Sequence, residues 1–190
     1  MKLRNARWLS RDIIDELIQE GDTVVDATAG NGYDTLYLAQ KVGEKGKVIA
    51  FDIQQAALDS TRQKLKENHC ENRVELVLDS HANMAKYVDT PPKAVLFNLG
   101  WFPTGDHNVT TMTDSTLQAV HAAMELVMPG GMVSVCMYPG HEEGTKEKNA
   151  LIEALGKADI RRFNVLHGHF LNQRENAVQV ILIQKEDGTD

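Results

Sequence analysis

The chain has 190 residues, of which 42% are hydrophobic and 25% charged, with 14 glycines and 5 prolines. This composition is typical of a globular protein and excludes collagenous and intrinsically disordered chains. The length fits a single domain over residues 1–190 that can bury a core without disulfide or metal staples. The net charge of −7 argues against binding polyanions by bulk electrostatics, although it leaves room for a local basic patch.

The cysteines and the apolar runs indicate the cellular setting. Cys70 and Cys136 lie far apart and form no C-x-x-C pair, so we expect reduced thiols and a cytoplasmic protein. Charges interrupt the N-terminal segment every few residues, and no apolar run approaches the length of a membrane span. We therefore expect neither secretion nor membrane insertion. A monomer and a homodimer are both compatible with the sequence.

Helical and strand patterns alternate along the chain. Ile13, Ile14, Leu17 and Ile18 have helical spacing and predict an amphipathic helix over residues 5–20. Short apolar, β-branched runs predict strands at 23–27, 47–53, 73–79, 94–98, 132–137, 162–166 and 177–184. Further helices are predicted at 33–42, 54–68, 114–128 and 142–158. The last two strands have no helical stretch between them.

This alternation predicts an α/β fold with a mostly parallel sheet and helices on both of its faces. Two consecutive strands without a crossover helix cannot be parallel neighbours, so the last strand should be antiparallel. Such a topology is expected for the Rossmann-like class I methyltransferases, whose seven strands have the order 3-2-1-4-5-7-6. Ligands of open sheets bind beyond the carboxyl ends of the strands at the switch point, here between strands 1 and 4.

Acidic residues end three successive predicted strands. Asp26 should project toward the turn that contains Gly30 and Gly32, where a carboxylate would repel a pyrophosphate but suit the ammonium and sulfonium of S-adenosylmethionine. Asp52 follows Gly32 at the distance from which a carboxylate accepts both ribose hydroxyls, a feature that NAD sites share. Asp79 could accept the adenine amine, or it could cap the next short helix. The pattern favours S-adenosylmethionine over NAD.

The end of the fourth strand carries a candidate acceptor site. The Asn98 carbonyl could accept a hydrogen bond from the nitrogen to be methylated, while Trp101 or Phe102 stacks on a base. Alternatively, the two aromatic residues cover the core under a loop. His141 or His81 could relay a proton, and each could equally be a surface or packing histidine. The other histidines have no metal-site spacing.

The chain resembles the bacterial tRNA (5-aminomethyl-2-thiouridine) methyltransferases of the MnmM/YtqB-like family, earlier labelled rRNA methylases. Five segments carry the resemblance: VVDATAGNG, FDIQ, LDSH, FNLGWFP and HFLNQR, starting at residues 24, 51, 78, 97 and 169. The resemblance implies N-methylation of the 5-aminomethyl group on the wobble uridine of tRNA. S-adenosylmethionine would be the methyl donor, and no metal is needed. Trp101 departs from the pattern, because a tyrosine is expected there in relatives.

The resemblance also implies site residues. Its cofactor motifs match Asp26, Gly30, Asn31, Gly32, Asp52, Gln54, Asp79, Ser80 and His81. Segments near its substrate end match Asn98, Gly100, Tyr138, His141 and Arg174. To the cofactor site we add Ala27, Ile53, Asn98 and Leu99, and we expect Asn98, Tyr138 and His141 to be catalytic.

Basic residues near both termini predict the RNA contacts. We expect Arg4, Arg7, Arg11 and Arg174 to contact the phosphates of an anticodon stem-loop, with Trp101, Phe102 and Pro103 beside the base. The plain alternative is solvated surface charge. The segment 103–113 could fold over the substrate. Four other functions stay open: an rRNA methyltransferase, a small-molecule amine methyltransferase, an NAD-dependent oxidoreductase and a noncatalytic RNA-binding module.

Overall fold

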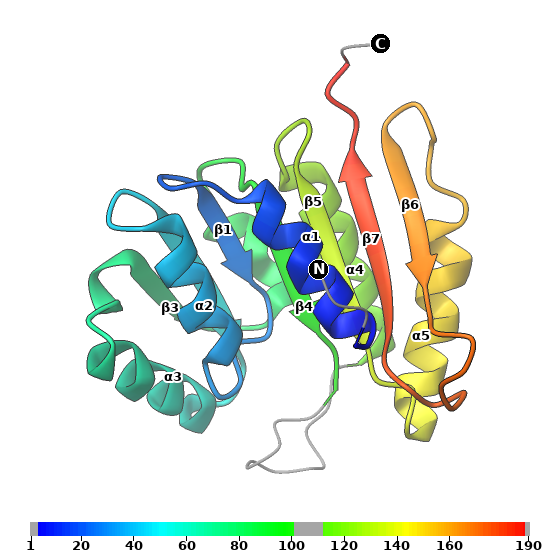
Figure 1. Ribbon diagram of the computed structural model, residues 1–190, viewed down its shortest axis with the longest axis horizontal. Helices are drawn as coiled ribbons and strands as arrows, with labels where there is room; N and C mark the ends of the chain where they lie inside the picture. Colours follow the sequence, from blue (N-terminus) through cyan, green and yellow to red (C-terminus); the bar gives the residue numbers. More distant parts are fainter. Residues whose placement is uncertain (1–3, 101–111, 189–190) are drawn as a thin grey trace.

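The computed structural model describes residues 4–100 and 112–188, and its central feature is one seven-stranded sheet (Figure 1). The strand order is β3-β2-β1-β4-β5-β7-β6. The strands are β1 Thr23–Asp26, β2 Lys47–Asp52, β3 Val74–Leu78, β4 Ala94–Asn98, β5 Met132–Met137, β6 Phe163–Gly168 and β7 Gln179–Lys185. β1 to β5 are parallel, and β7 pairs antiparallel with both β5 and β6. The predicted order and the antiparallel last strand are confirmed.

In the described part of the chain, five α-helices surround the sheet and two short 3-10 helices lie in the connections. Their bounds are α1 Ala6–Leu17, α2 Tyr33–Val42, α3 Gln55–Glu67, α4 Thr113–Leu126, α5 Glu142–Leu155, η1 Glu71–Arg73 and η2 His81–Lys86. α1 ends three residues earlier than predicted because Ile18 is already extended. α5 likewise ends before residue 158, since Gly156 follows its last helical turn.

The helices form two layers, so both faces of the sheet are covered as predicted. α1, α2 and α3 lie on one face, and α4 and α5 lie on the other (Figure 1). Apolar residues of the central strands alternate between two cores: Val25 and Phe97 belong to the core under α4 and α5, whereas Val24 and Leu96 belong to the core under α1 to α3. This alternation is the period of two that a strand imposes.

Strand register brings the predicted polar residues to one edge of the sheet. Asp26 at the end of β1 pairs with Ala50 of β2 and with Leu96 of β4. Asn98, at the end of β4, is two residues beyond Leu96. Because parallel strands end on the same edge, the loops after β1, β2, β3 and β4 meet there, at the switch point that open sheets use for ligands.

Candidate active site

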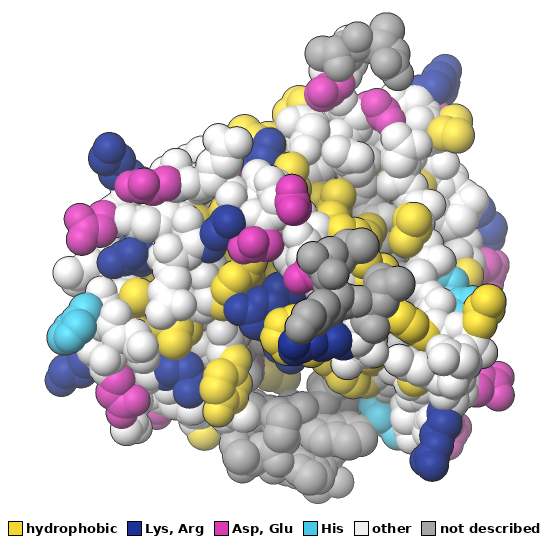
Figure 2. All heavy atoms as spheres, viewed as in Figure 1, with side chains coloured by type: hydrophobic (Ala, Val, Ile, Leu, Met, Phe, Trp, Pro, Cys, Tyr) yellow, Lys and Arg dark blue, Asp and Glu magenta, His cyan; other side chains and the backbone are white. Residues whose placement is uncertain are grey.

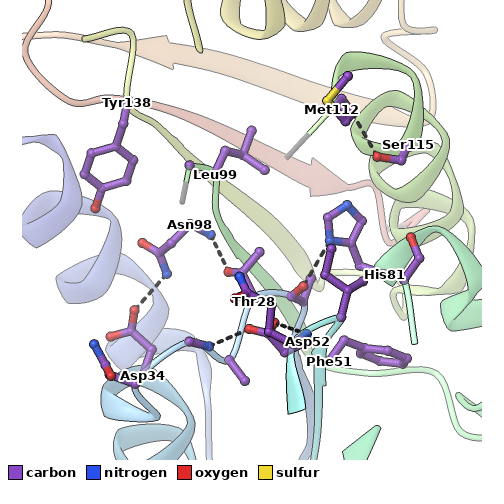
Figure 3. A pocket seen from close by; sticks show the side chains of 18 of the residues that line it. Thr28, Asp34, Phe51, Asp52, His81, Asn98, Leu99, Met112, Ser115 and Tyr138 are labelled. Carbon is purple, nitrogen blue, oxygen red and sulfur yellow. Dashed lines mark hydrogen bonds between the residues drawn. The ribbon is translucent and has the colours of Figure 1, made fainter. Parts of the chain in front are cut away.

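A cavity of about 480 Å³ opens at this edge. That volume lies in the range of small-molecule and cofactor sites. The structure places fifteen of the predicted site residues on its wall: Arg7, Ala27, Gly30, Asn31, Asp52, Ile53, Gln54, Asp79, Ser80, His81, Asn98, Leu99, Gly100, Tyr138 and His141. The wall also contains Thr28, Asp34, Met112 and Ser115, which the sequence patterns did not single out (Figure 3).

Asp52 organises the loop between β1 and α2. Its carboxylate accepts the backbone N–H of Gly30 at 2.9 Å and the backbone N–H of Gln54 at 2.9 Å. Gly30 has a φ of +52°, which an L side chain rarely adopts. A carboxylate has about four lone-pair positions, so two remain for the hydroxyls of a ribose. The geometry therefore suits the predicted ribose contact.

Asp26 points toward the turn, as predicted, through the Thr28 N–H, but it does not line the cavity, and its predicted contact with the cofactor stays a prediction. The side chain is fully buried, accepting the Thr35 hydroxyl at 2.6 Å and the Thr28 backbone N–H at 3.1 Å. Burial, reinforced by the nearby charge of Asp34, raises the pKa of Asp26 to about 7. Asp26 thus fixes the loop and the start of α2 from below.

Gly32 also lies outside the cavity wall, although we predicted a cofactor contact for it. It precedes α2 with a φ of +74°. A Cβ at this position would lie 2.8 Å from the Cα of Thr61 on α3. Gly32 is therefore required by backbone conformation and by the close approach of α3.

Asp79 and Ser80 together order the segment after β3. The Asp79 carboxylate accepts the Ser80 N–H at 2.7 Å, the Asn83 amide at 2.9 Å and the Tyr87 hydroxyl at 2.8 Å. These hydrogen bonds, those from Asn83 and Tyr87 foremost, lower the pKa of Asp79. Ser80 itself caps η2. Asp79 is thus held ionised on the cavity wall, with one lone-pair position left for a ligand amine.

One ring nitrogen of His81, in the cavity wall, has no hydrogen-bond partner among the described residues. Its Nδ1 lies 3.2 Å from the Ala27 carbonyl oxygen. Because a carbonyl only accepts, Nδ1 carries the proton and Nε2 carries the lone pair. Nε2 is buried and has no hydrogen-bond partner among the described residues. Burial lowers the pKa of His81, which keeps the ring neutral and makes Nε2 an acceptor for a ligand donor.

Asn98 is held in place by two hydrogen bonds to neighbouring residues. Its backbone N–H donates to the Thr28 hydroxyl at 2.8 Å, and its side-chain NH₂ donates to Asp34 at 2.8 Å (Figure 3). Its carbonyl Oδ1 is buried and has no hydrogen-bond partner within the described part of the chain. A buried acceptor without a donor is costly. Asn98 therefore offers a hydrogen-bond acceptor to whatever occupies this end of the cavity.

Arg7 lies in the cavity wall in an ion pair with Asp34, and its predicted contact with an RNA phosphate stays a prediction. One guanidinium nitrogen donates to both carboxylate oxygens of Asp34 at 2.9 Å. The Asp34 side chain is only 14% exposed. One feature of the sequence could have indicated Asp34: an acidic residue in the first turn of the helix after a glycine turn is favoured by the helix dipole.

Tyr138 and His141 follow β5 and reach the same cavity. Burial raises the pKa of Tyr138 to about 12, so its hydroxyl stays protonated and can donate. Figure 3 shows its ring directed toward the end of the cavity that holds Asn98 and Asp34. His141 Nδ1 accepts the Gly144 N–H at 3.1 Å and caps α5. That nitrogen is therefore not available as a proton acceptor.

Arg4, Arg11 and Arg174, which we also predicted to contact RNA, lie outside the cavity wall. The Arg11 guanidinium stacks 3.8 Å from the Tyr37 ring centroid and 5.5 Å from that of Trp8. Arg174 lies in the connection between β6 and β7. Trp101, Phe102 and Pro103, with most of the segment 103–113, lie outside the described residues.

The polar groups that line the cavity fit S-adenosylmethionine. Asp34, Asp52 and Asp79 line the cavity together with Arg7, an acidic balance that suits a positively charged ligand and opposes a pyrophosphate. Because Arg7 neutralises Asp34, the acidic character that we assigned to Asp26 is supplied largely by Asp52 and Asp79. Asp52 is placed for ribose hydroxyls, and His81 Nε2 and Asn98 Oδ1 await donors. Among the described residues no group of three or more His, Cys, Asp or Glu could hold a metal ion.

Comparison with known proteins agrees with this assignment. A family model described as "Putative rRNA methylase" matches residues 48–184. The chain is 37% identical over 166 residues to the chloroplastic tRNA (mnm(5)s(2)U34)-methyltransferase of Arabidopsis thaliana, covering 80% of this chain and 59% of that protein. It is 29% identical over 150 residues to the ubiquinone/menaquinone C-methyltransferase UbiE of Escherichia coli, with 78% and 52% coverage. The chain thus spans only 52–59% of the length of these relatives.

Several solved structures match over nearly the whole chain. One, described as a "putative rRNA-methylase" from Clostridium thermocellum, is 44% identical with a TM-score of 0.95, covering 97% of this chain and 100% of the other. A "putative methyltransferase" from Streptococcus mutans in complex with SAH is 34% identical with a TM-score of 0.88, covering 97% and 99%.

Proposed function

This chain belongs to the family described as "Putative rRNA methylase" and is an S-adenosylmethionine-dependent methyltransferase, and we propose that it methylates an amine on RNA. The proposed acceptor is the 5-aminomethyl group on the wobble uridine of tRNA, and the product is its 5-methylaminomethyl form. The tRNA methyltransferase of Arabidopsis supports this choice over the ribosomal RNA that the family description names.

The observation that carries the proposal is the carbonyl Oδ1 of Asn98. It is a buried acceptor that no described residue satisfies, and it lies at the end of β4, in the cavity wall. An amine nitrogen that donates one N–H to Oδ1 would have its lone pair oriented by that contact. A carbon acceptor has no N–H or O–H to donate and would leave Oδ1 unsatisfied.

For this reaction the protein must align the methyl group with the amine that accepts it. The cofactor supplies an electrophilic methyl group bonded to a sulfonium, and transfer breaks that C–S bond as the amine lone pair forms a new C–N bond. Asn98 would orient the neutral amine, and Asp52 would hold the ribose. Tyr138, protonated at neutral pH because burial raises its pKa to about 12, can donate a hydrogen bond beside them. Holding the reacting atoms in line is worth several powers of ten in rate.

Basic and aromatic side chains on α1 and beside it support an RNA substrate. The Arg4 guanidinium lies 4.7 Å from the ring centroid of Trp8, and Arg11 lies between Trp8 and Tyr37. Figure 2 shows basic side chains gathered on the face of the molecule that α1 covers. Stacked guanidinium groups keep their N–H donors directed outward for phosphate oxygens.

The connection between β6 and β7 lies beside the start of α1. The Gln173 amide donates to the Arg4 carbonyl at 3.2 Å, and Arg174 follows directly in that connection. Basic residues from both ends of the chain can therefore contribute to one RNA-binding surface.

The proposal includes a site of action. None of the described helices is long and apolar enough to cross a membrane, and Cys70 and Cys136 are buried free thiols. The Arabidopsis relative is chloroplastic. We propose that this chain acts on tRNA in the cytoplasm, where thiols stay reduced.

Nucleoside mass spectrometry of methylated RNA tests the proposal. The enzyme is incubated with methyl-labelled cofactor and, separately, tRNA whose wobble uridine carries a 5-aminomethyl group, unmodified tRNA, and ribosomal RNA. Label in a methylated 5-aminomethyluridine from the first substrate alone is the expected result. Label in ribosomal nucleosides, or no label in the modified tRNA, would overturn it.

A further inference from the structure

Asn98 can present either its carbonyl or its NH₂ to the cavity, because the two ends of an amide have nearly the same shape. Only the carbonyl can accept from a substrate amine. We propose that Asp34 and Arg7 form a positioning pair that fixes the amide of Asn98 with Oδ1 toward the acceptor nitrogen. The functional reading of this pair rests on the proposed function, whereas the orientation itself does not.

The contacts form a chain across three elements. Arg7 on α1 donates to both oxygens of Asp34 at 2.9 Å, and Asp34 on α2 accepts the NH₂ of Asn98 at 2.8 Å. A carboxylate only accepts hydrogen bonds, so the amide must direct its NH₂ to Asp34. Oδ1 then faces away from Asp34, and Figure 3 shows Asn98 between Asp34 and Tyr138 in this orientation.

Arg7 fixes the position of the Asp34 carboxylate. The Asp34 side chain is only 14% exposed, and one Arg7 nitrogen donates to both of its oxygens at 2.9 Å. Oδ2 of Asp34, which accepts from Arg7, is also the oxygen that accepts the NH₂ of Asn98 at 2.8 Å. The guanidinium therefore holds this acceptor in the place on which the orientation of Asn98 depends.

A merely structural role would be to tie α1 to α2, and a second pair offers a matched control for that role. Asp15 on α1 accepts Lys41 of α2 at 3.1 Å and the Tyr37 hydroxyl at 2.7 Å. It joins the same two helices through a carboxylate, but it does not line the cavity. Loss of the Asp15 pair should therefore reproduce any effect on helix packing without any effect on Asn98.

Kinetics of Asp34→Asn, Arg7→Gln and Asp15→Asn test the inference. We expect Asp34→Asn to lower kcat about 10- to 100-fold, because a misaligned acceptor amine raises the activation barrier of methyl transfer. The cofactor Kd should stay within about threefold of wild type. Arg7→Gln should have a smaller effect of the same kind. Asp15→Asn should lower the Tm about as much as Asp34→Asn does, but it should leave kcat unchanged. Equal kcat values for Asp34→Asn and Asp15→Asn would overturn the inference.

A double-mutant cycle asks whether Asp34 acts through Asn98. In an Asn98→Ala background the amide is gone, so adding Asp34→Asn should change kcat by less than about twofold. If the two losses multiply instead, Asp34 acts on its own, and its role as a positioning residue is wrong. A cofactor Kd that rises as much as kcat falls would assign Asp34 to the cofactor instead.

The orientation of Asn98 can be measured without any RNA, which separates this inference from the proposed function. Side-chain ¹⁵N–¹H₂ signals of asparagine are recorded for the cofactor-bound enzyme, and Asn98→Ala identifies the signal that belongs to residue 98. We expect its NH₂ protons to be protected from exchange in wild type and in Asp15→Asn but not in Asp34→Asn. Protection that persists in Asp34→Asn overturns the inference, whereas inactivity of wild type toward tRNA overturns only the proposed function.

Discussion

The backbone N–H of Gly30 donates to the carboxylate of Asp52 at 2.9 Å, across 22 positions of sequence. This bond joins the loop after β1 to the end of β2, and the Thr61 hydroxyl secures the same loop from α3 by donating to the Gly30 carbonyl at 3.1 Å. The residue placed to hold a ribose therefore also shapes the loop that faces it. Preorganisation of this kind lowers the ordering cost of binding.

Replacing Asp52 by Ala should weaken cofactor binding by about 1–3 kcal/mol, because ribose hydroxyls lose a charged acceptor and the loop loses a tether. Asp52→Asn should weaken binding less, since its carbonyl can still accept from Gly30. Isothermal titration calorimetry with S-adenosylhomocysteine measures both variants, with circular dichroism to check folding. An unchanged Kd in Asp52→Ala would remove this residue from the ribose site.

Asn98→Ala should reduce methyl transfer about 10²-fold or more while the cofactor Kd stays close to wild type. Its carbonyl is a buried acceptor that none of the described side chains satisfies, and loss of alignment raises the barrier rather than weakening cofactor binding. Single-turnover kinetics on modified tRNA and calorimetry with the cofactor separate the two effects. Parallel losses in both measurements would place Asn98 in the cofactor pocket.

The fold could be predicted because local patterns and topology rules agree in this chain. Buried runs such as residues 24–25 and 94–97 are short and apolar, and glycines follow them within a few positions. Their alternation with helices permits few arrangements. The ends of elements were less certain. α1 stops at Leu17 because the chain turns to enter β1, and that turn depends on tertiary contacts rather than on helix propensity.

The site was predicted less completely, because sequence places a residue at the end of a strand without fixing the direction of its side chain. Asp26 turned inward, where Thr35 and Thr28 satisfy it, while Asp34 from the following helix faces the cavity. The pairing of Arg7 with Asp34 joins residues 27 positions apart on separate helices. Neither periodicity nor motif spacing reports such a contact.

Asp26 should make stability depend on pH. Its pKa is raised to about 7 in the folded chain from an unfolded value near 3.9, so the folded state holds an extra proton between these values. Its stabilising contribution is fully present below about pH 4 and is lost as pH rises through about 7. We expect the free energy of unfolding to fall by about 2–4 kcal/mol across that window from this group.

Asp26→Asn should flatten this pH dependence, since an amide of the same shape carries no charge. Its carbonyl can accept the Thr28 N–H while its NH₂ donates to the Thr35 hydroxyl. Urea unfolding at several pH values between about 4 and 8 gives the comparison, with Glu16→Gln on the exposed face of α1 as control. If wild type and Asp26→Asn changed stability with pH in the same way, the raised pKa of Asp26 would be wrong.

His141→Asn should keep most of the stability and activity, because asparagine is a good helix N-cap and can accept the Gly144 N–H in place of Nδ1. His141→Ala should lose about 1 kcal/mol of stability through the missing cap. Thermal unfolding and initial rates on modified tRNA measure both. A stable His141→Asn enzyme that turns over about 10²-fold more slowly would instead make this histidine the proton acceptor.

Arg4→Gln combined with Arg11→Gln should raise the KM for tRNA several-fold and leave cofactor binding unchanged. Their stacked guanidinium groups lie at the start of the chain and on α1, outside the cavity wall. Arg7 is left in place, since its ion pair with Asp34 would confound the result. Steady-state kinetics on modified tRNA and calorimetry with the cofactor measure the two effects, and Arg62→Gln on the exposed side of α3 is the control.

The salt dependence of tRNA binding tests the same surface independently. With few contacts in an acidic protein, log K for tRNA should fall with log salt at a slope of about 2–3, because each phosphate contact contributes ~0.7–0.9. The Arg4→Gln, Arg11→Gln double variant should lower that slope by about 1–2, whereas Arg62→Gln should leave it unchanged. Full activity and an unchanged slope in the double variant would move the RNA surface to another face of the molecule, since counterion release reports only the cations that the phosphates contact.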